Sequence, residues 1–162
     1  MDSIPKTGDA FHALIPVHIY GNPCDFDKVK NFAESQNDIP IIEDACQSIL
    51  GSIDNKNAGT WGLAGAFSLH PLKNINVWSD GGIITTNNLA LYKKLLLLRN
   101  HGLVDRDTVK IPGYNSRLDT LQAVVGNWIL PKAKAISDKR IANANYLDNG
   151  CLLYTSPSPR DQ

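Results

Sequence analysis

Residues 13–44 read ALIPVHIYGNPCDFDKVKNFAESQNDIPIIED and contain the clearest succession of strand and helix signals in the chain. Residues 13–19 form an apolar run of strand length, which the turn residues 21–23 end. Asp25 can cap a helix whose apolar residues recur every three or four positions. Residues 40–42 then predict a second strand. Strand, helix and strand in this order predict a βαβ unit with parallel strands and a right-handed crossover.

The second strand leads directly into Asp44. Parallel strands end at the same edge of a sheet, and ligands in open α/β sheets bind outside that edge, so Asp44 lies where chemistry is expected. A loop rich in Gly and Asn follows, and further elements continue the α/β pattern. We expect strands at 65–69 and 83–86, a helix over 89–99 capped by Asn87 or Asn88, a helix over 118–128 that Pro131 ends or bends, and a last helix over about 132–146.

Composition narrows the class of protein. The chain has 162 residues, of which 43% are hydrophobic and 20% charged, as in one globular domain. Sixteen basic and sixteen acidic residues give a net charge of +0, which argues against a nucleic-acid binder. No membrane span or secretory signal is recognised, so a cytoplasmic protein is expected. Three cysteines without CxxC spacing and four scattered histidines predict neither a disulfide framework nor a metal site.

The common nucleotide and hydrolase motifs GxGxxG, GxxxxGK[ST] and GxSxG are missing. What remains is a set of polar residues at strand ends, namely Asp44, Gln47, Ser68 and Lys73. Lys73 lies between two apolar stretches, and desolvation favours the neutral amine that forms imines. An aspartate facing a pyridinium nitrogen, together with such a lysine, is the basic equipment for pyridoxal 5′-phosphate (PLP). On spacing alone this signal is weak, because many α/β chains place an Asp and a Lys at strand ends.

The amino-acid sequences of six segments are a more specific signal than this spacing. They are PVHIYG (16–21), IEDACQS (42–48), AFSLHPLKN (66–74), SDGG (79–82), RNHG (99–102) and GYNSRLD (113–119). In this order they resemble the DegT/DnrJ/EryC1/StrS family of PLP-dependent aminotransferases, which act on nucleotide-linked keto sugars. The resemblance implies an α/β fold with a mostly parallel sheet flanked by helices, as a fragment of the large domain of a fold-type I PLP-dependent aminotransferase. Residues 1–150 would be this partial PLP-binding domain and residues 151–162 a non-native tail.

The resemblance also implies roles for individual residues. Lys73 would be the catalytic residue, holding PLP covalently and moving a proton. Asp44 would pair with the ring nitrogen, Gln47 would lie near the 3-hydroxyl, and Ser68 would donate to the phosphate. The family builds its site across a homodimer, which implies that Asn115 reaches the phosphate of the partner subunit. His70, His18 and Arg117 would contribute to substrate binding, Arg117 by ordering the crossing loop.

Each role has a simpler alternative. Asp44 could cap a helix, Gln47 and Ser68 could serve backbone hydrogen bonds, His18 could be a core histidine, and Asn115 could belong to a turn. The implied function is transamination of a nucleotide-linked keto sugar with an amino acid donor, glutamate. A dehydratase of the same family is one alternative, although its histidine in place of the imine lysine disagrees with Lys73. A non-catalytic truncated homologue is the other.

Overall fold

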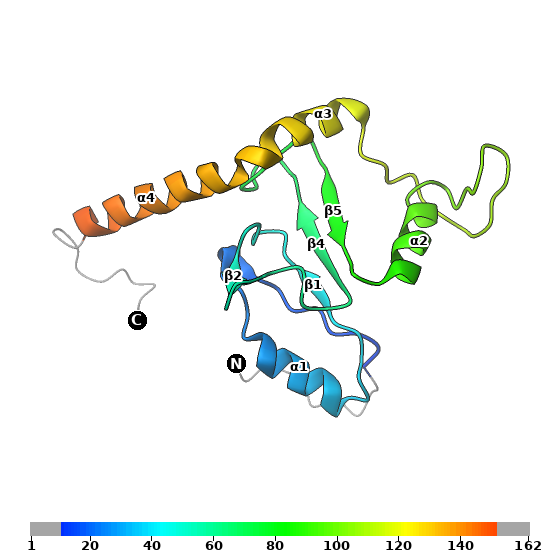
Figure 1. Cartoon of the computed structure of the whole chain (residues 1–162), viewed down its shortest axis with the longest axis horizontal. Helices are drawn as coiled ribbons and strands as arrows, with labels where there is room; N and C mark the ends of the chain where they lie inside the picture. The colour runs from blue at the N-terminus through cyan, green and yellow to red at the C-terminus, as the bar shows by residue number, and fades with distance from the viewer. Residues whose placement is uncertain (1–10, 152–162) are drawn as a thin grey trace.

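The computed structural model describes residues 11–151, which form a small sheet with helices at its ends (Figure 1). The main sheet has the order β1-β4-β5, with β1 at Ile42–Asp44, β4 at Ala64–Ser68 and β5 at Gly82–Thr85. β1 pairs parallel with β4, whereas β5 pairs antiparallel with β4 and forms the open edge of this sheet. The expected mostly parallel sheet is therefore corrected to a mixed one. The chain between β4 and β5 contains no crossover helix, and an antiparallel return does not need one.

The predicted first strand at 13–19 is reduced to two parallel bridges, Leu14 to Ile41 and Val17 to Asp44. Pro16 lies between them and has no N–H to donate to a ladder. The βαβ order is nevertheless present, because α1 (Phe26–Ser35) connects the two parallel segments. Its predicted cap is confirmed, since Asp25 Oδ1 accepts from Lys28 N at 3.2 Å.

The predicted loop after β1 contains a short hairpin instead. Its strands are β2 (Ser52–Ile53) and β3 (Lys56–Asn57), which pair antiparallel. The turn residues Asp54 and Asn55 have φ values of 50° and 63°, as a tight hairpin turn requires. Asp and Asn tolerate this left-handed conformation better than most residues. The local sequence is therefore compatible with the hairpin but does not by itself predict it.

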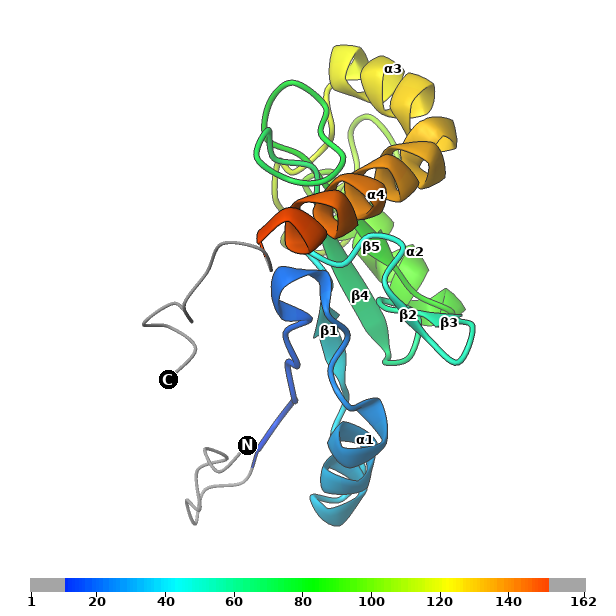
Figure 2. The ribbon, with the colours of Figure 1, turned by 90° about the vertical axis from the view of Figure 1, so that its left-hand side faces the viewer.

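The remaining helices follow the sequence pattern closely. Asn88 caps α2 (Leu89–Leu98), with its side chain accepting from Leu91 N at 2.9 Å. Pro131 lies in the 3-10 turn η2 (Leu130–Lys132), which separates α3 (Thr120–Ile129) from α4 (Ala133–Cys151). Two views place α1 and α3 at opposite ends of the sheet (Figures 1 and 2). Within residues 11–151, none of these helices is long and apolar enough to cross a membrane.

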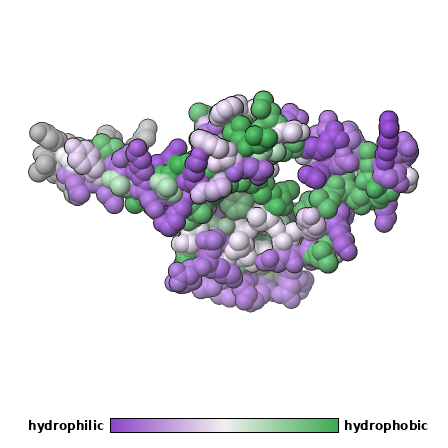
Figure 3. Space-filling model, turned by 45° about the horizontal axis from the view of Figure 1, so that its top comes forward, coloured by the Kyte–Doolittle hydropathy of each residue, from purple (hydrophilic) through white to green (hydrophobic). Residues whose placement is uncertain are grey.

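The core is small and lies beside the loop that follows β4. Leu69, Ile75 and Val77 are buried together with Ala133 at the start of α4. Much other apolar surface stays exposed, as the green areas at the centre of Figure 3 show. Because the buried residues of this loop lie on both sides of Lys73 in the sequence, the core fixes the backbone that carries the lysine.

Candidate functional site

A polar cavity of about 760 Å³ opens beyond the carboxyl ends of β1 and β4. This is the edge at which the βαβ pattern predicts a site. The cavity brings together four of the predicted residues, Gln47, Ser68, His70 and Lys73. Its remaining lining consists of Tyr20, Leu72, Asn74, Asp80 and Gly81.

Lys73 is half-buried and stands at the end of a tight turn. Its backbone N–H donates to His70 O at 2.8 Å, and Leu72 N donates to His70 Nδ1 at 3.1 Å. The neutral His70 ring must then carry its proton on Nε2, which lies 3.7 Å from Asp80 Oδ1. His70 thus lines the cavity and also shapes the turn that presents the lysine.

Asp44 ends β1, and its Oδ1 accepts from Cys46 N at 3.1 Å. No helix follows at this point, so the carboxylate closes a short turn and does not cap a helix. Burial raises the pKa of the Cys46 thiol, the Asp44 carboxylate raises it further, and the Lys73 ammonium opposes both. Cys46 is therefore a protonated thiol at neutral pH and not a nucleophile. Both charges act on the Cys46 thiol, but Asp44, unlike Lys73, is not among the residues that line the cavity.

Ser68 and Gln47 each make one backbone hydrogen bond and keep a further donor. Ser68 Oγ accepts from His70 N at 3.3 Å, which leaves the hydroxyl hydrogen available. Gln47 Oε1 accepts from Tyr20 N at 2.6 Å, which leaves the amide NH₂. The backbone role considered from the sequence is present for both residues, and it does not use up their capacity to donate.

His18 is not brought to the cavity. It is fully buried, its Nε2 lies 3.0 Å from Glu43 Oε2, and Cys24 N donates to its Nδ1 at 3.1 Å. With both ring nitrogens engaged inside the protein, His18 has the environment of a core histidine. Glu43 was not singled out in the sequence, because an acidic residue within a strand gives no sign of its buried partners.

Asn115 and Arg117 also lie outside the cavity lining, on the exposed chain between α2 and α3. Asn115 forms an antiparallel bridge with Asn100, and Arg117 Nη1 donates to Asn100 Oδ1 at 2.6 Å. Arg117 therefore orders this segment within its own chain.

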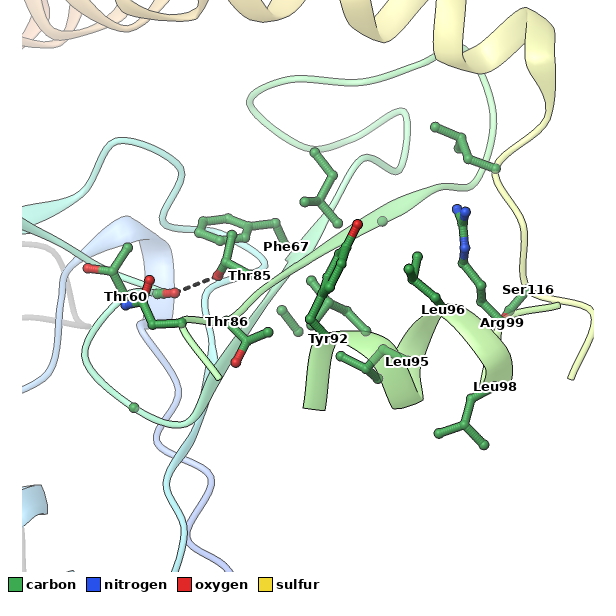
Figure 4. Close-up of a pocket in the computed structure, with 18 of the residues that line it drawn as sticks. Thr60, Phe67, Thr85, Thr86, Tyr92, Leu95, Leu96, Leu98, Arg99 and Ser116 are labelled. Atoms are coloured by element: carbon green, nitrogen blue, oxygen red, sulfur yellow. Dashed lines mark hydrogen bonds between the residues drawn. The ribbon is translucent and has the colours of Figure 1, made fainter. Parts of the chain in front are cut away.

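A larger cavity of about 1170 Å³ runs along β5 and α2 (Figure 4). Apolar side chains dominate its lining, among them Phe67, Tyr92, Leu95 and Leu96. The hydroxyl of Thr85, which also lines it, is bonded to Gly59 O at 2.5 Å. The described residues that line this cavity include no lysine and no carboxylate. Size alone would select it, but acid–base and covalent chemistry need the groups of the smaller, polar cavity.

Known proteins are similar to this chain in sequence and in fold. Residues 4–152 match the model of the DegT/DnrJ/EryC1/StrS aminotransferase family. The UDP-N-acetyl-3-dehydro-alpha-D-glucosamine 3-aminotransferase of Acidithiobacillus ferrooxidans is 39% identical over 128 residues, which are 79% of this chain and 34% of that protein.

Two solved structures extend the comparison. S. venezuelae DesV in complex with a ketimine intermediate has a TM-score of 0.73 and 35% identity, covering 76% of this chain and 33% of that chain. The E. coli GDP-4-keto-6-deoxy-D-mannose-3-dehydratase with bound hydrated PLP has a TM-score of 0.78 and 30% identity, covering 87% and 41%. This chain spans about a third of the length of the curated relatives it matches. With an α/β aminotransferase fold and a family match over nearly its whole length, the chain belongs to the DegT/DnrJ/EryC1/StrS aminotransferase family.

Proposed function

We propose that this chain is part of a PLP-dependent aminotransferase that moves an amino group from glutamate to a nucleotide-linked keto sugar. The observation that carries the proposal is the polar cavity beyond the carboxyl ends of β1 and β4, which Lys73, Ser68 and Gln47 line, with Asp44 at the end of β1. The relatives named above include an aminotransferase of a UDP-linked sugar and a protein with bound PLP. These names support the same substrate class and the same cofactor.

Three polar groups of the cavity, together with the carboxylate of Asp44 at the end of β1, fit PLP group by group. The Lys73 amine suits an aldehyde, the Asp44 carboxylate a protonated ring nitrogen, the Ser68 hydroxyl a phosphate oxygen and the Gln47 amide a phenolic oxygen. When bound, the cofactor supplies an electron sink beside the Cα of the amino donor. Lys73 Nζ would hold the cofactor and carry a proton to and from the reacting carbon. Asp44 would keep the proton on the ring nitrogen.

Lys73 separates this proposal from its closest alternative. The dehydratase structure matches this chain as well as aminotransferase structures do, with TM-scores of 0.78 and 0.79, so the fold does not distinguish the two reactions. A dehydratase of this family would have histidine at the imine position, and here the residue is lysine. Transamination is therefore the better proposal.

The finer placement within the family is part of the proposal. Residues 1–150 would form part of the large domain of a fold-type I enzyme, and residues 152–162 of the predicted non-native tail lie outside the described structure. The whole protein would be a cytoplasmic homodimer, with Asn115 of one protomer reaching the phosphate held by its partner. The exposure of Asn115 leaves it available for such a contact.

The test is covalent trapping of the cofactor. The chain is incubated with PLP, reduced with borohydride, digested and analysed by mass spectrometry. The expected result is a pyridoxyl group on Lys73, together with loss of the bound-cofactor absorbance when glutamate is added before reduction. A pyridoxyl group only on other lysines would overturn the assignment, and PLP bound at Lys73 that does not respond to glutamate would favour a non-catalytic binding protein.

A further inference from the structure

The turn η1 (Ile19–Gly21) touches the loop that follows β1 at two points beyond the sheet. Tyr20 N donates to Gln47 Oε1 at 2.6 Å, and Ser48 Oγ donates to Gly21 O at 3.3 Å. Just before the turn, His18 N donates to Asp44 O at 3.0 Å. The chain around the turn is thus bonded to the end of β1 and to the loop that carries Gln47 to the cavity.

The hydrogen bond from Tyr20 N determines the orientation of the Gln47 side-chain amide. A backbone N–H can only donate, so the atom facing Tyr20 N must be the amide oxygen. The NH₂ group is then at the other branch of the side chain. Gln47 lines the polar cavity and is exposed, and no described residue accepts a hydrogen bond from its Nε2. The amide therefore offers the cavity a donor and not an acceptor.

This arrangement depends on an unusual backbone. Tyr20 has φ 55° and Gly21 has φ 84°, both in the left-handed region. At Gly21 a Cβ atom would also lie 2.9 Å from the carbonyl oxygen of Gln47, so a side chain there would push against the loop. Hydrogen bonds from Gly21 N to His18 O and from Asn22 N to Ile19 O hold the turn in this shape.

We propose that the Tyr20 main chain is a positioning group for Gln47. By occupying the amide oxygen, it fixes the Gln47 NH₂ as a donor to an acceptor atom of the molecule bound in the cavity. The inference rests on the proposed function in one respect only, namely that PLP is the probe. It makes Gln47 a residue with two separate tasks, one toward Tyr20 and one toward the ligand.

Two variants of Gln47 separate these tasks. Gln47→Glu keeps an oxygen for Tyr20 N and replaces the NH₂ by a second oxygen. Gln47→Met has a similar length, no charge and neither group. We expect the urea midpoint of the chain without PLP to be unchanged in Gln47→Glu and lowered in Gln47→Met. PLP affinity, measured from the absorbance of the bound cofactor, should fall at least about tenfold in both.

One control variant tests the effect of added charge, and each contrary result overturns a different part of the inference. Gln36→Glu at the end of α1 adds the same charge away from the cavity, and it should leave PLP affinity unchanged. If Gln47→Glu or Gln47→Met binds PLP as tightly as the unaltered chain, the donor role is overturned. If Gln47→Met has the same urea midpoint as the unaltered chain, the bond from Tyr20 N does not hold the Gln47 side chain. The positioning role of the Tyr20 main chain is then overturned. Failure of the unaltered chain to bind PLP would instead refute the proposed function.

Discussion

His18 and Glu43 form a fully buried pair in which Nε2 lies 3.0 Å from Oε2. Cys24 N donates a hydrogen bond to Nδ1, so the proton of the neutral ring is on Nε2. The Nε2–H group then donates a hydrogen bond to the Glu43 carboxylate. Glu43 also accepts from three backbone N–H groups within residues 59–62, at 2.6–2.7 Å. One buried side chain therefore joins β1 to the segment before it and to the loop before β4, next to Asp44.

Replacing Glu43 should destabilise the fold strongly. Glu43→Gln puts an NH₂ group where the structure has only donors, so at least one buried N–H loses its acceptor. We expect unfolding to become easier by about 3 kcal/mol, measured by urea denaturation. Glu34→Gln is the matched control, because Glu34 is exposed and, among the described residues, forms one ion pair, with Lys30 at 3.6 Å. Its effect should stay within about 0.5 kcal/mol. Equal effects of the two substitutions would mean that the buried network contributes little.

Lys73→Ala should abolish covalent attachment of PLP, because within residues 11–151 no other amine lines the polar cavity. The readout is the pyridoxyl-peptide yield after borohydride reduction, compared with the unaltered chain. Lys134→Ala, on the exposed side of α4, should leave that yield unchanged. An undiminished yield in Lys73→Ala would show that PLP reacts elsewhere on the chain.

Asp44→Asn should slow the reaction of bound PLP with glutamate by orders of magnitude, because an amide does not hold a proton on the ring nitrogen. The fold should survive, since an Asn oxygen can still accept from Cys46 N. Stopped-flow absorbance measures the rate, and the urea midpoint reports the fold. An unchanged rate would remove Asp44 from the proposed mechanism.

The Cys46 thiol reports on Asp44 and Lys73 without any cofactor. Its pKa is raised by burial and by the Asp44 carboxylate and is lowered by Lys73. In a Cys24→Ser background, Asp44→Asn should lower the pKa of Cys46 and Lys73→Ala should raise it, so alkylation should begin at lower and at higher pH, respectively. The pH dependence of iodoacetamide labelling at Cys46, followed by peptide mass spectrometry, measures both. Shifts of the same sign would contradict the placement of the two charges.

Asn88→Ala should cost about 1 kcal/mol through loss of the α2 cap. Asn87→Ala is the neighbouring control, because Asn88 Oδ1 makes the bond to Leu91 N. Urea denaturation of both variants distinguishes the cap from a general loss of polar surface.

The features predicted correctly are those set by residues close in sequence. Asp25 and Asn88 cap helices by reaching a backbone N–H three residues ahead, and Pro131 separates α3 from α4 through its own missing N–H. The place of Lys73 beyond β4 follows from the strand pattern in the same way.

The features that were missed depend on distant partners. Glu43 is buried because the loop at 59–62 folds over it, and the sequence around position 43 does not reveal that loop. His18, within the apolar run at 13–19, was considered both as a substrate-binding residue and as a core histidine, and the carboxylate that holds it inside is distant in sequence. The antiparallel direction of β5 is likewise decided by where the chain returns, which no local pattern encodes.

The open side of β5 has a consequence for handling the protein. Its outward N–H and C=O groups can add a strand from another molecule, and Ile84 beside them is exposed. Concentrated samples of this chain should therefore be prone to intermolecular β-association, which light scattering would detect as a rise in apparent mass with concentration.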